Sequence, residues 1–282
     1  MKQAKLAILA ITASLISVTA FGQPSSPPSN ARPAISVVPI YLTDLRAIAA
    51  LRIGDHPPAP VVFDTGATSN TIDSDYAAAL KLEFDPTVHV HVGDGTGNTF
   101  EAKQAKVPVA TLGEVPLTAK TATVFPYKER DVVGIFVPNS FAGRQVLLDL
   151  RHGRLIVRSR GAGNPCSNGT PYTPSGLPTV MLHLPGLSLP AVLDTGSNSP
   201  LVLDTRLARK LPLRRPLQSA GKGTTVTGQH DVYEARLASE IRIGPLALRN
   251  PTVKFSSSDA SVPYMGLPII RQLLIMLDPE QQ

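Results

Sequence analysis

The stretch Pro60-Val61-Val62-Phe63-Asp64-Thr65-Gly66-Ala67-Thr68-Ser69 is an apolar run that ends in a carboxylate, a hydroxyl and a glycine. The same order of residue types returns in Leu189-Pro190-Ala191-Val192-Leu193-Asp194-Thr195-Gly196-Ser197-Asn198, where Asp194 follows Asp64 by 130 positions. Each stretch predicts a buried strand that leads into a tight turn. The chain therefore carries one such turn in each half.

Other features recur at nearly the same offset. A short helix with an aspartate at its cap position is predicted after Asp73 and again after Asp204, and a glycine-rich piece that predicts a hairpin follows each helix. The further pairs are Leu112-Gly113 with Ile243-Gly244, Val132-Val133-Gly134-Ile135 with Tyr264-Met265-Gly266-Leu267, and Leu147-Leu148-Asp149 with Met276-Leu277-Asp278. A duplicated chain predicts two similar lobes, and similar lobes pack about a pseudo-twofold axis that brings Asp64 and Asp194 face to face.

The composition predicts a mostly β protein. The 282 residues are 43% hydrophobic, which is enough for two modest cores, and they include 27 prolines, 21 glycines and many short runs of Val, Leu, Ile and Thr. The net charge of +6 is spread along the chain, and aromatic residues make up 5% with no Trp. This pattern argues against a stacking platform for nucleic acid and favours a solvated basic surface.

Five segments are predicted along the chain. Two lysines before an apolar run predict a secretory signal peptide, and a Pro/Ser-rich piece after it predicts a disordered spacer. A Gly/Pro/Ser/Asn-rich piece in the middle predicts the linker between the lobes. The boundaries are 1–22 for the signal peptide, 23–34 for the spacer, 35–158 for the N-terminal lobe, 159–176 for the linker and 177–282 for the C-terminal lobe. We therefore expect a secreted or periplasmic protein whose single cysteine, Cys166, forms no internal disulfide.

Two facing carboxylates have a defined chemistry. At about 3 Å apart they cannot both ionise cheaply, so they share one proton. The ionised member can take a proton from a water molecule while the protonated member hydrogen-bonds the carbonyl under attack. This predicts hydrolysis of a peptide bond by Asp64 and Asp194 without a metal, a cofactor or a covalent intermediate. The turn residues Thr65, Gly66, Thr195 and Gly196 are expected to hold the two aspartates in place.

On these residues the sequence resembles the aspartic peptidases that include pepsin and the retropepsins. The resemblance rests on Asp64-Thr65-Gly66-Ala67, on Asp194-Thr195-Gly196-Ser197 and on the apolar-Gly segments ending at Gly134 and Gly266. It implies a two-lobed acid protease fold with a short helix in each lobe and an extended peptide as substrate. Short lobes, Ala67 and the absence of paired cysteines are more similar to bacterial retropepsin-like proteins with two fused halves, so we expect a monomer.

The resemblance also implies flaps that cover the substrate. We assign them to the glycine-rich hairpins and expect one from each lobe; the residues are Gly93, Asp94, Gly95, Thr96, Gly97, Gly221 and Gly223. Ser197 can offer its aspartate a hydroxyl that Ala67 cannot. We therefore expect Asp194 to ionise more easily and Asp64 to carry the shared proton.

Three alternatives remain open at this point. The fold could bind peptides or serve as a scaffold without catalysis. A metal-dependent hydrolase could use His89, His91 and an aspartate, although no third ligand stands at suitable spacing. The segment Gly93-x-Gly95-x-Gly97 could cradle a phosphate, but it is followed by strand-like residues rather than by a helix.

Overall fold

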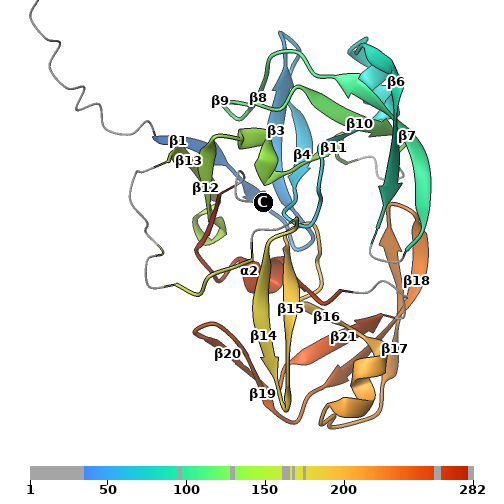
Figure 1. Ribbon diagram of the computed structural model, residues 1–282, viewed down its shortest axis with the longest axis vertical. Coiled ribbons are helices and arrows are strands. Elements are labelled where there is room, and N and C mark those ends of the chain that lie inside the picture. The colour runs from blue at the N-terminus through green and yellow to red at the C-terminus, as the bar shows by residue number, and fades with distance from the viewer. Residues whose placement is uncertain are drawn as a thin grey trace, which may run out of the picture. The chain divides into compact units, whose positions relative to one another are not determined.

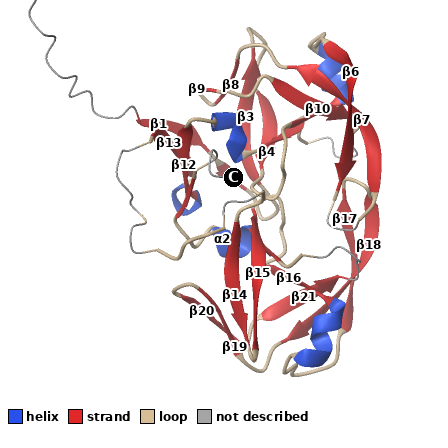
Figure 2. Ribbon diagram, viewed as in Figure 1, coloured by secondary structure: helices blue, strands red, loops and turns tan. Residues whose placement is uncertain are grey.

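The computed structural model describes residues 35–94, 97–127, 131–160, 166, 169–173, 176–256 and 262–278. The predicted signal peptide and spacer, together with Gly95 and Thr96, lie outside these residues. Strands account for most of the described chain (Figure 2). The mostly β, two-lobed fold predicted from the sequence is therefore confirmed.

The first lobe is built on one sheet, with the strand order β6-β7-β10-β5-β11-β4-β3-β8-β9 and with β2 paired to β3. We call it the N-lobe. Its strands are β2 (Tyr41–Leu42), β3 (Ala47–Ile53), β4 (Ala59–Phe63), β5 (Thr71–Asp73), β6 (Phe84–Gly93), β7 (Thr99–Lys106), β8 (Ala110–Leu112), β9 (Val115–Pro116), β10 (Thr121–Phe125) and β11 (Gly134–Phe136).

The second lobe, the C-lobe, has a sheet with the order β17-β18-β21-β16-β22-β15-β14-β19-β20, which matches the N-lobe order strand for strand (Figure 1). Its strands are β14 (Thr179–Leu184), β15 (Leu187–Asp194), β16 (Leu201–Asp204), β17 (Gln218–Thr225), β18 (Gly228–Arg236), β19 (Glu240–Ile243), β20 (Leu246–Arg249), β21 (Thr252–Ser256) and β22 (Tyr264–Gly266). The internal duplication is thus a duplication of structure.

A third sheet joins the two halves, in the order β1-β13-β12-β23. Its strands are β1 (Ile35–Pro39), β12 (Arg144–Asp149), β13 (Arg154–Ser159) and β23 (Ile275–Leu277). Strands β12 and β23 are antiparallel, with Leu147 opposite Met276. These two residues are also counterparts in the duplicated sequence, so the segment pairs with its own copy, as it would across the twofold axis of a dimer.

The predicted short helices form and are capped as expected. In α1 (Ser74–Ala79) the Asp73 carboxylate accepts hydrogen bonds from the amides of Asp75 and Tyr76. In the C-lobe the Asp204 carboxylate accepts from the Arg206 amide, but the helix is the 3₁₀ helix η3 (Thr205–Lys210). The remaining short helices were not predicted; they are η1 (Pro138–Phe141), η2 (Leu150–His152) and α2 (Leu267–Ile270).

One predicted equivalence is wrong. The sequence pairs Gly134 with Gly266, but Asp194 lies opposite Gly266 in the β15–β22 pair, whereas Phe63 lies opposite Phe136 in the β4–β11 pair. The counterpart of Gly266 is therefore Val137, three residues after Gly134. The glycine pattern misled because Gly134 meets a different neighbour: a Cβ there would lie 2.4 Å from the Thr71 carbonyl oxygen.

Candidate active site

Asp64 and Asp194 stand at equivalent ends of buried strands. Asp64 follows β4 and donates its amide to the carbonyl of Phe136 at 2.9 Å, while Asp194 is the last residue of β15. Phe63 and Leu193, the residues just before them, point into the hydrophobic core. Each aspartate therefore leaves a strand that is fixed on one side by the core and on its edge by a parallel neighbour.

The two turns are locked together by their threonines. The Thr65 hydroxyl donates to the Leu193 carbonyl at 2.6 Å and accepts from the Thr195 amide at 3.1 Å. The Thr195 hydroxyl donates to the Phe63 carbonyl at 2.7 Å and accepts from the Thr65 amide at 3.0 Å. All four bonds are buried and cross between the lobes, so they fix the relative position of the two turns.

The two glycines allow the carboxyl groups to meet. A Cβ at Gly66 would lie 2.5 Å from Cγ of Asp194, and a Cβ at Gly196 would lie 2.5 Å from Oδ2 of Asp64. Each aspartate thus packs against the glycine of the opposite turn. No side chain fits at either position without moving a carboxyl group, which explains why both turns carry glycine.

Backbone amides surround the carboxyl pair. Gly66 donates to Asp64 Oδ1 at 2.7 Å, and Gly196 and Ser197 donate to Asp194 Oδ1 at 2.9 and 3.1 Å. The two carboxyl groups are close enough for each to affect the pKa of the other. Two buried carboxyls in such proximity cannot both ionise cheaply, so we expect the pair to share one proton.

Burial raises the pKa of Asp64 and raises the pKa of Asp194 well above its usual range, the latter also because the Asp64 charge is adjacent. The two groups titrate as a pair, and the expectation from the sequence that Asp64 carries the shared proton stays a prediction. The Ser197 hydroxyl accepts from the Ser199 amide at 3.2 Å, so it braces its own loop, and the Ser197 amide is what reaches Asp194.

Asn70 is a site residue that the sequence analysis missed. Its buried side-chain oxygen accepts hydrogen bonds from the Val137 amide at 3.0 Å and from the Ser140 hydroxyl at 2.6 Å. It thereby ties the loop after Asp64 to the start of η1. In the C-lobe the tie is made by main chain: the Gly266 amide donates to the Pro200 carbonyl at 3.1 Å, and the Leu267 amide donates to the Ser197 carbonyl at 2.8 Å.

The predicted flaps lie on two hairpins, β6–β7 and β17–β18, whose tips meet (Figure 1). At the contact, the Asp94 carboxylate accepts from the hydroxyl of Thr227, and from its amide at 3.4 Å. Thr227 was not predicted. Gly93 ends β6 and Gly97 has a φ of +86°, which turns the chain back toward β7.

The C-lobe glycines have separate roles. Gly221 has a φ of +90° and lies in an irregular part of the β17–β18 pair, between Ser219 and Lys222. At Gly223 a Cβ would lie 2.6 Å from Nε2 of His230, so the imidazole ring covers the glycine. Both glycines therefore shape the hairpin itself.

One row of side chains accompanies each aspartate. Val62 lies two residues before Asp64 on the same face of β4, opposite Ile48 on β3 and Ile135 on β11. We call these three residues the N-row. Their C-lobe counterparts Thr179, Val192 and Tyr264 form the C-row. None of the six belongs to the core cluster, so both rows lie on the sheet face that carries the aspartate.

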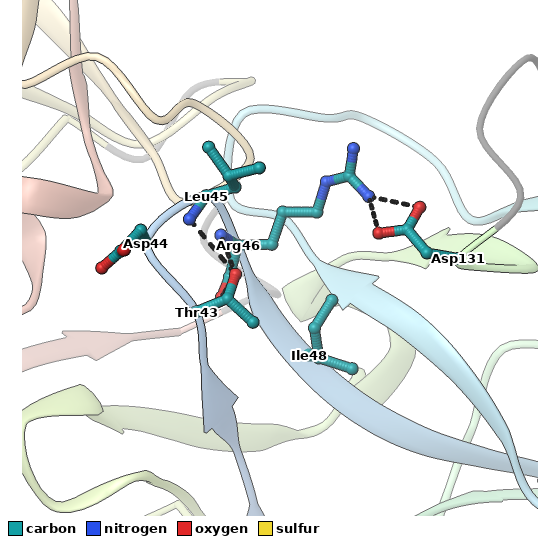
Figure 3. Close-up of a pocket in the computed structure, with 6 residues that line it drawn as sticks. All are labelled: Thr43, Asp44, Leu45, Arg46, Ile48 and Asp131. Carbon is teal, nitrogen blue, oxygen red and sulfur yellow. Dashed lines mark hydrogen bonds and ion pairs between the residues drawn. The ribbon is translucent and has the colours of Figure 1, made fainter.

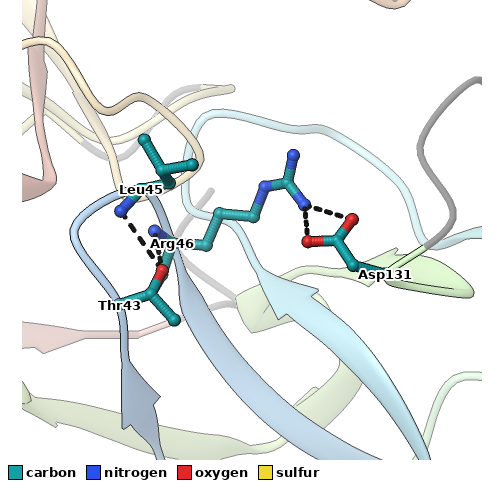
Figure 4. A network of polar contacts seen from close by, with 4 residues as sticks. All are labelled: Thr43, Leu45, Arg46 and Asp131. Atoms are coloured by element: carbon teal, nitrogen blue, oxygen red, sulfur yellow. Dashed lines mark hydrogen bonds and ion pairs between the residues drawn. The ribbon is translucent and has the colours of Figure 1, made fainter.

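A cavity of about 500 Å³ opens beside the N-row (Figure 3). Ile48 forms part of its wall, and the Arg46 guanidinium extends over it toward Asp131, while the Asp44 carboxylate points away. Arg46 Nη1 donates to both Asp131 oxygens at 2.8 Å. The Thr43 hydroxyl accepts from the Arg46 amide at 2.9 Å and from the Leu45 amide at 3.2 Å (Figure 4). The pocket therefore has an apolar wall and a fixed ion pair at its mouth.

The histidines considered as metal ligands are not brought together with a third ligand. His89 contacts Glu101 across the β6–β7 hairpin. Within the part of the chain that the structure describes, no three His, Cys, Asp or Glu side chains form a group that could hold a metal ion. No described helix is long and apolar enough to cross a membrane.

Comparison with known proteins agrees with this geometry. No curated protein matches the sequence. A model of the aspartyl protease family matches residues 49–148 and 180–268, which include one Asp-Thr-Gly turn each and together cover more than half of the chain. With two equivalent lobes and two interlocked Asp-Thr-Gly turns, the chain belongs to the aspartyl protease family, as a two-lobed, retropepsin-like member.

Proposed function

We propose that this protein is an aspartic endopeptidase that hydrolyses peptide bonds with a water molecule activated between Asp64 and Asp194. The observation that carries the proposal is the mutual packing of the turns, in which each carboxyl lies against the glycine of the other lobe. This packing leaves one shared proton in the pair, which is the protonation state that acid and base catalysis by two carboxyls requires.

The roles follow from the position of the proton. The protonated carboxyl of the pair donates a hydrogen bond to the carbonyl oxygen of the scissile bond, and the ionised carboxyl accepts a proton as water attacks the carbonyl carbon. The tetrahedral intermediate then breaks its C–N bond while the proton taken from the water passes to the leaving nitrogen. Because the pKa values of both carboxyls are raised, activity extends from acid pH toward mildly acidic pH.

The two hairpins supply the substrate cover in this proposal. Contact between Asp94 and Thr227 joins the tips of β6–β7 and β17–β18, and an extended peptide beneath them can pair its main chain with the hairpin edges. We assign Gly93, Asp94, Gly97, Gly221 and Gly223 to this cover, together with Gly95 and Thr96, which lie outside the described residues.

The test is cleavage of a reduced, carboxymethylated protein between pH 3 and pH 8. Wild type is expected to cleave it, to be inhibited by pepstatin and to be indifferent to chelators. Asp64→Asn and Asp194→Asn should each reduce the rate at least about 100-fold, because each removes an acid–base group. Asp55→Asn, in an exposed loop, should leave the rate unchanged.

Two outcomes contradict the proposal in different ways. Full turnover in Asp64→Asn overturns the mechanism. Wild-type protein that binds the unfolded chain without cleaving it favours a peptide-binding protein instead, and loss of activity with a chelator favours a metal-dependent hydrolase.

We also propose that the chain is exported and acts outside the cytoplasm. Lys2 and Lys5 before the apolar run from Leu6 to Ala20 support this proposal. Mass spectrometry of the exported protein should give an N-terminus at Gln23. Recovery of intact Met1 from the cytoplasmic fraction alone overturns it.

A further inference from the structure

The N-row and the C-row differ in chemistry although they occupy equivalent positions. Each is centred on a valine two residues before its aspartate, Val62 or Val192. On the parallel strand that pairs with the aspartate strand, β11 in the N-lobe and β22 in the C-lobe, the N-row has Ile135 and the C-row has Tyr264. The N-row is thus entirely aliphatic, whereas the C-row carries hydroxyl groups on both sides of its valine.

The Tyr264 side chain lies on the same face as Asp194. Met265, the next residue, is fully buried in the core, so alternation along β22 turns Tyr264 to the opposite face, where it is half-buried. Its strand partner is Val192, which shares that face with Asp194. The phenol therefore stands beside the catalytic pair rather than in the core of the lobe.

The Tyr264 hydroxyl remains a hydrogen-bond donor. Burial and the nearby Asp194 charge raise the pKa of Tyr264 to about 12, so the phenol keeps its proton at any pH where the dyad works. Because the residue is only half-buried, the hydroxyl can donate to water or to a bound substrate. A substrate that displaces water from this face must supply an acceptor or leave the donor unpaired, which costs binding energy.

We propose that Tyr264 is a specificity-determining residue that donates its hydroxyl to the side-chain amide oxygen of an Asn or Gln bound against the C-row. The proposal rests on the peptidase function proposed above. A neutral acceptor is favoured because the dyad carries one negative charge beside the phenol, which repels a carboxylate side chain. An aliphatic side chain would leave the hydroxyl unpaired.

The N-row imposes the opposite preference. Ile48, Val62 and Ile135 offer no polar side-chain atom, so they favour an aliphatic or aromatic residue. The preferred substrate then has an apolar residue on one side of the scissile bond and an Asn or Gln on the other. The two preferences together fix which way the peptide lies in the cleft.

The experiment uses peptides with a fixed Leu on one side of the scissile bond and Gln, Met or Glu on the other side. Each peptide is made in both orders, with the Leu before or after the bond. Met matches Gln in length and volume but lacks the amide. In the productive order, wild type should prefer Gln over Met by roughly 3- to 15-fold in kcat/KM, the worth of one neutral hydrogen bond, and should cleave Glu most slowly.

Tyr264→Phe should remove this preference, because the Gln peptide loses its donor and the Met peptide no longer leaves a hydroxyl unpaired. The kcat/KM should fall for the Gln peptide and hold or rise for the Met peptide. The matched control is Tyr76→Phe, which removes a hydroxyl from a tyrosine that packs against the N-lobe core; it should keep the wild-type ratio. A general loss of folding would slow both peptides equally, so the ratio isolates the hydroxyl.

Binding separates this inference from the peptidase proposal. Reduced-bond versions of the Gln and Met peptides, which cannot be cleaved, should show the same preference in Kd with wild type and none with Tyr264→Phe. An absence of all cleavage with an intact Kd preference overturns only the peptidase function. A Gln preference that persists in Tyr264→Phe, or is absent in wild type by both measurements, overturns the role of Tyr264.

Discussion

The two lobes hold their Asp-Thr-Gly turns with identical contacts on one side and different contacts on the other. Between the lobes, each threonine hydrogen-bonds the opposite turn and each glycine packs against the opposite aspartate, so these contacts are reciprocal. Behind the seam, the N-lobe braces its turn with the Asn70 side chain, whereas the C-lobe packs Gly266 directly against the loop of Ser197 and Ser199. The contacts between the lobes are therefore the same in both directions, whereas the contacts within each lobe differ.

The largest expected effect comes from adding a side chain at Gly266, where the C-lobe packs tightly against the loop after Asp194. A Cβ at Gly266 would lie 2.1 Å from the Ser199 carbonyl oxygen, and a backbone atom cannot move aside cheaply. Gly266→Ala should lower the free energy of unfolding by about 3 kcal/mol or more, measured by urea unfolding. Val137→Ala at the N-lobe counterpart should cost about 2 kcal/mol, the loss of two buried methyl groups. Equal costs at the two positions would mean that the lobes are braced alike.

The next effect comes from removing the N-lobe brace. Asn70→Ala leaves the Val137 amide and the Ser140 hydroxyl without their acceptor in a buried position. The free energy of unfolding should fall by about 2–3 kcal/mol. Pro200, whose main-chain carbonyl accepts from the Gly266 amide in the C-lobe, offers no side-chain acceptor, so Pro200→Ala should cost less than about 1 kcal/mol. Denaturant midpoints for both variants decide the matter, and an unaltered Asn70→Ala protein would remove the role assigned to this side chain.

The smallest effect concerns stability against pH. The raised pKa values of Asp64 and Asp194 mean that the folded state holds more protons than the unfolded chain between the ordinary carboxyl pKa of 3.8 and the raised values. Stability therefore falls as pH rises through that window, by about 1.4 kcal/mol for each pH unit that separates folded from unfolded pKa. Asp194→Asn removes this penalty, so its melting temperature should exceed that of wild type at pH 7 and approach it at pH 3.

Asp149 provides a control of opposite sign. Burial raises its pKa, but hydrogen bonds from His152 and Arg154 outweigh this and leave the pKa lowered. The favourable contacts are present at neutral pH and are lost as pH falls through the lowered value. Asp149→Asn should therefore destabilise the protein at pH 7 and matter less at low pH. A parallel response of the two variants would contradict the assignment of the dyad.

The facing pair of aspartates could be predicted from the sequence because its determinants are local and occur twice. Asp64-Thr65-Gly66 and Asp194-Thr195-Gly196 each follow a short apolar run, and each is followed by a helix cap that the structure confirms. The repeat in the sequence was enough to predict the pseudo-twofold arrangement, because equivalent segments of two similar lobes face each other whatever their individual long-range contacts. The fold class followed from the same features.

The residues that were missed depend on which strand lies beside which. Asn70 and Thr227 are ordinary polar residues in sequence, and they become important only because Val137 and Asp94 lie within hydrogen-bond distance. Gly266 was matched to the wrong partner because spacing alone does not give the register of a parallel strand pair.

The pairing of β12 with β23 brings a segment against its own copy, Leu147 opposite Met276. Two identical half-length chains could make the same contact, but they would have to carry the same residue at both positions of every equivalent pair. A symmetric dimer of that kind presents the same surface to a peptide entering in either direction. Joining the halves into one chain releases that constraint, so that Ile135 and Tyr264 can differ and the two sides of the proposed active site can distinguish the N-to-C direction of a bound peptide.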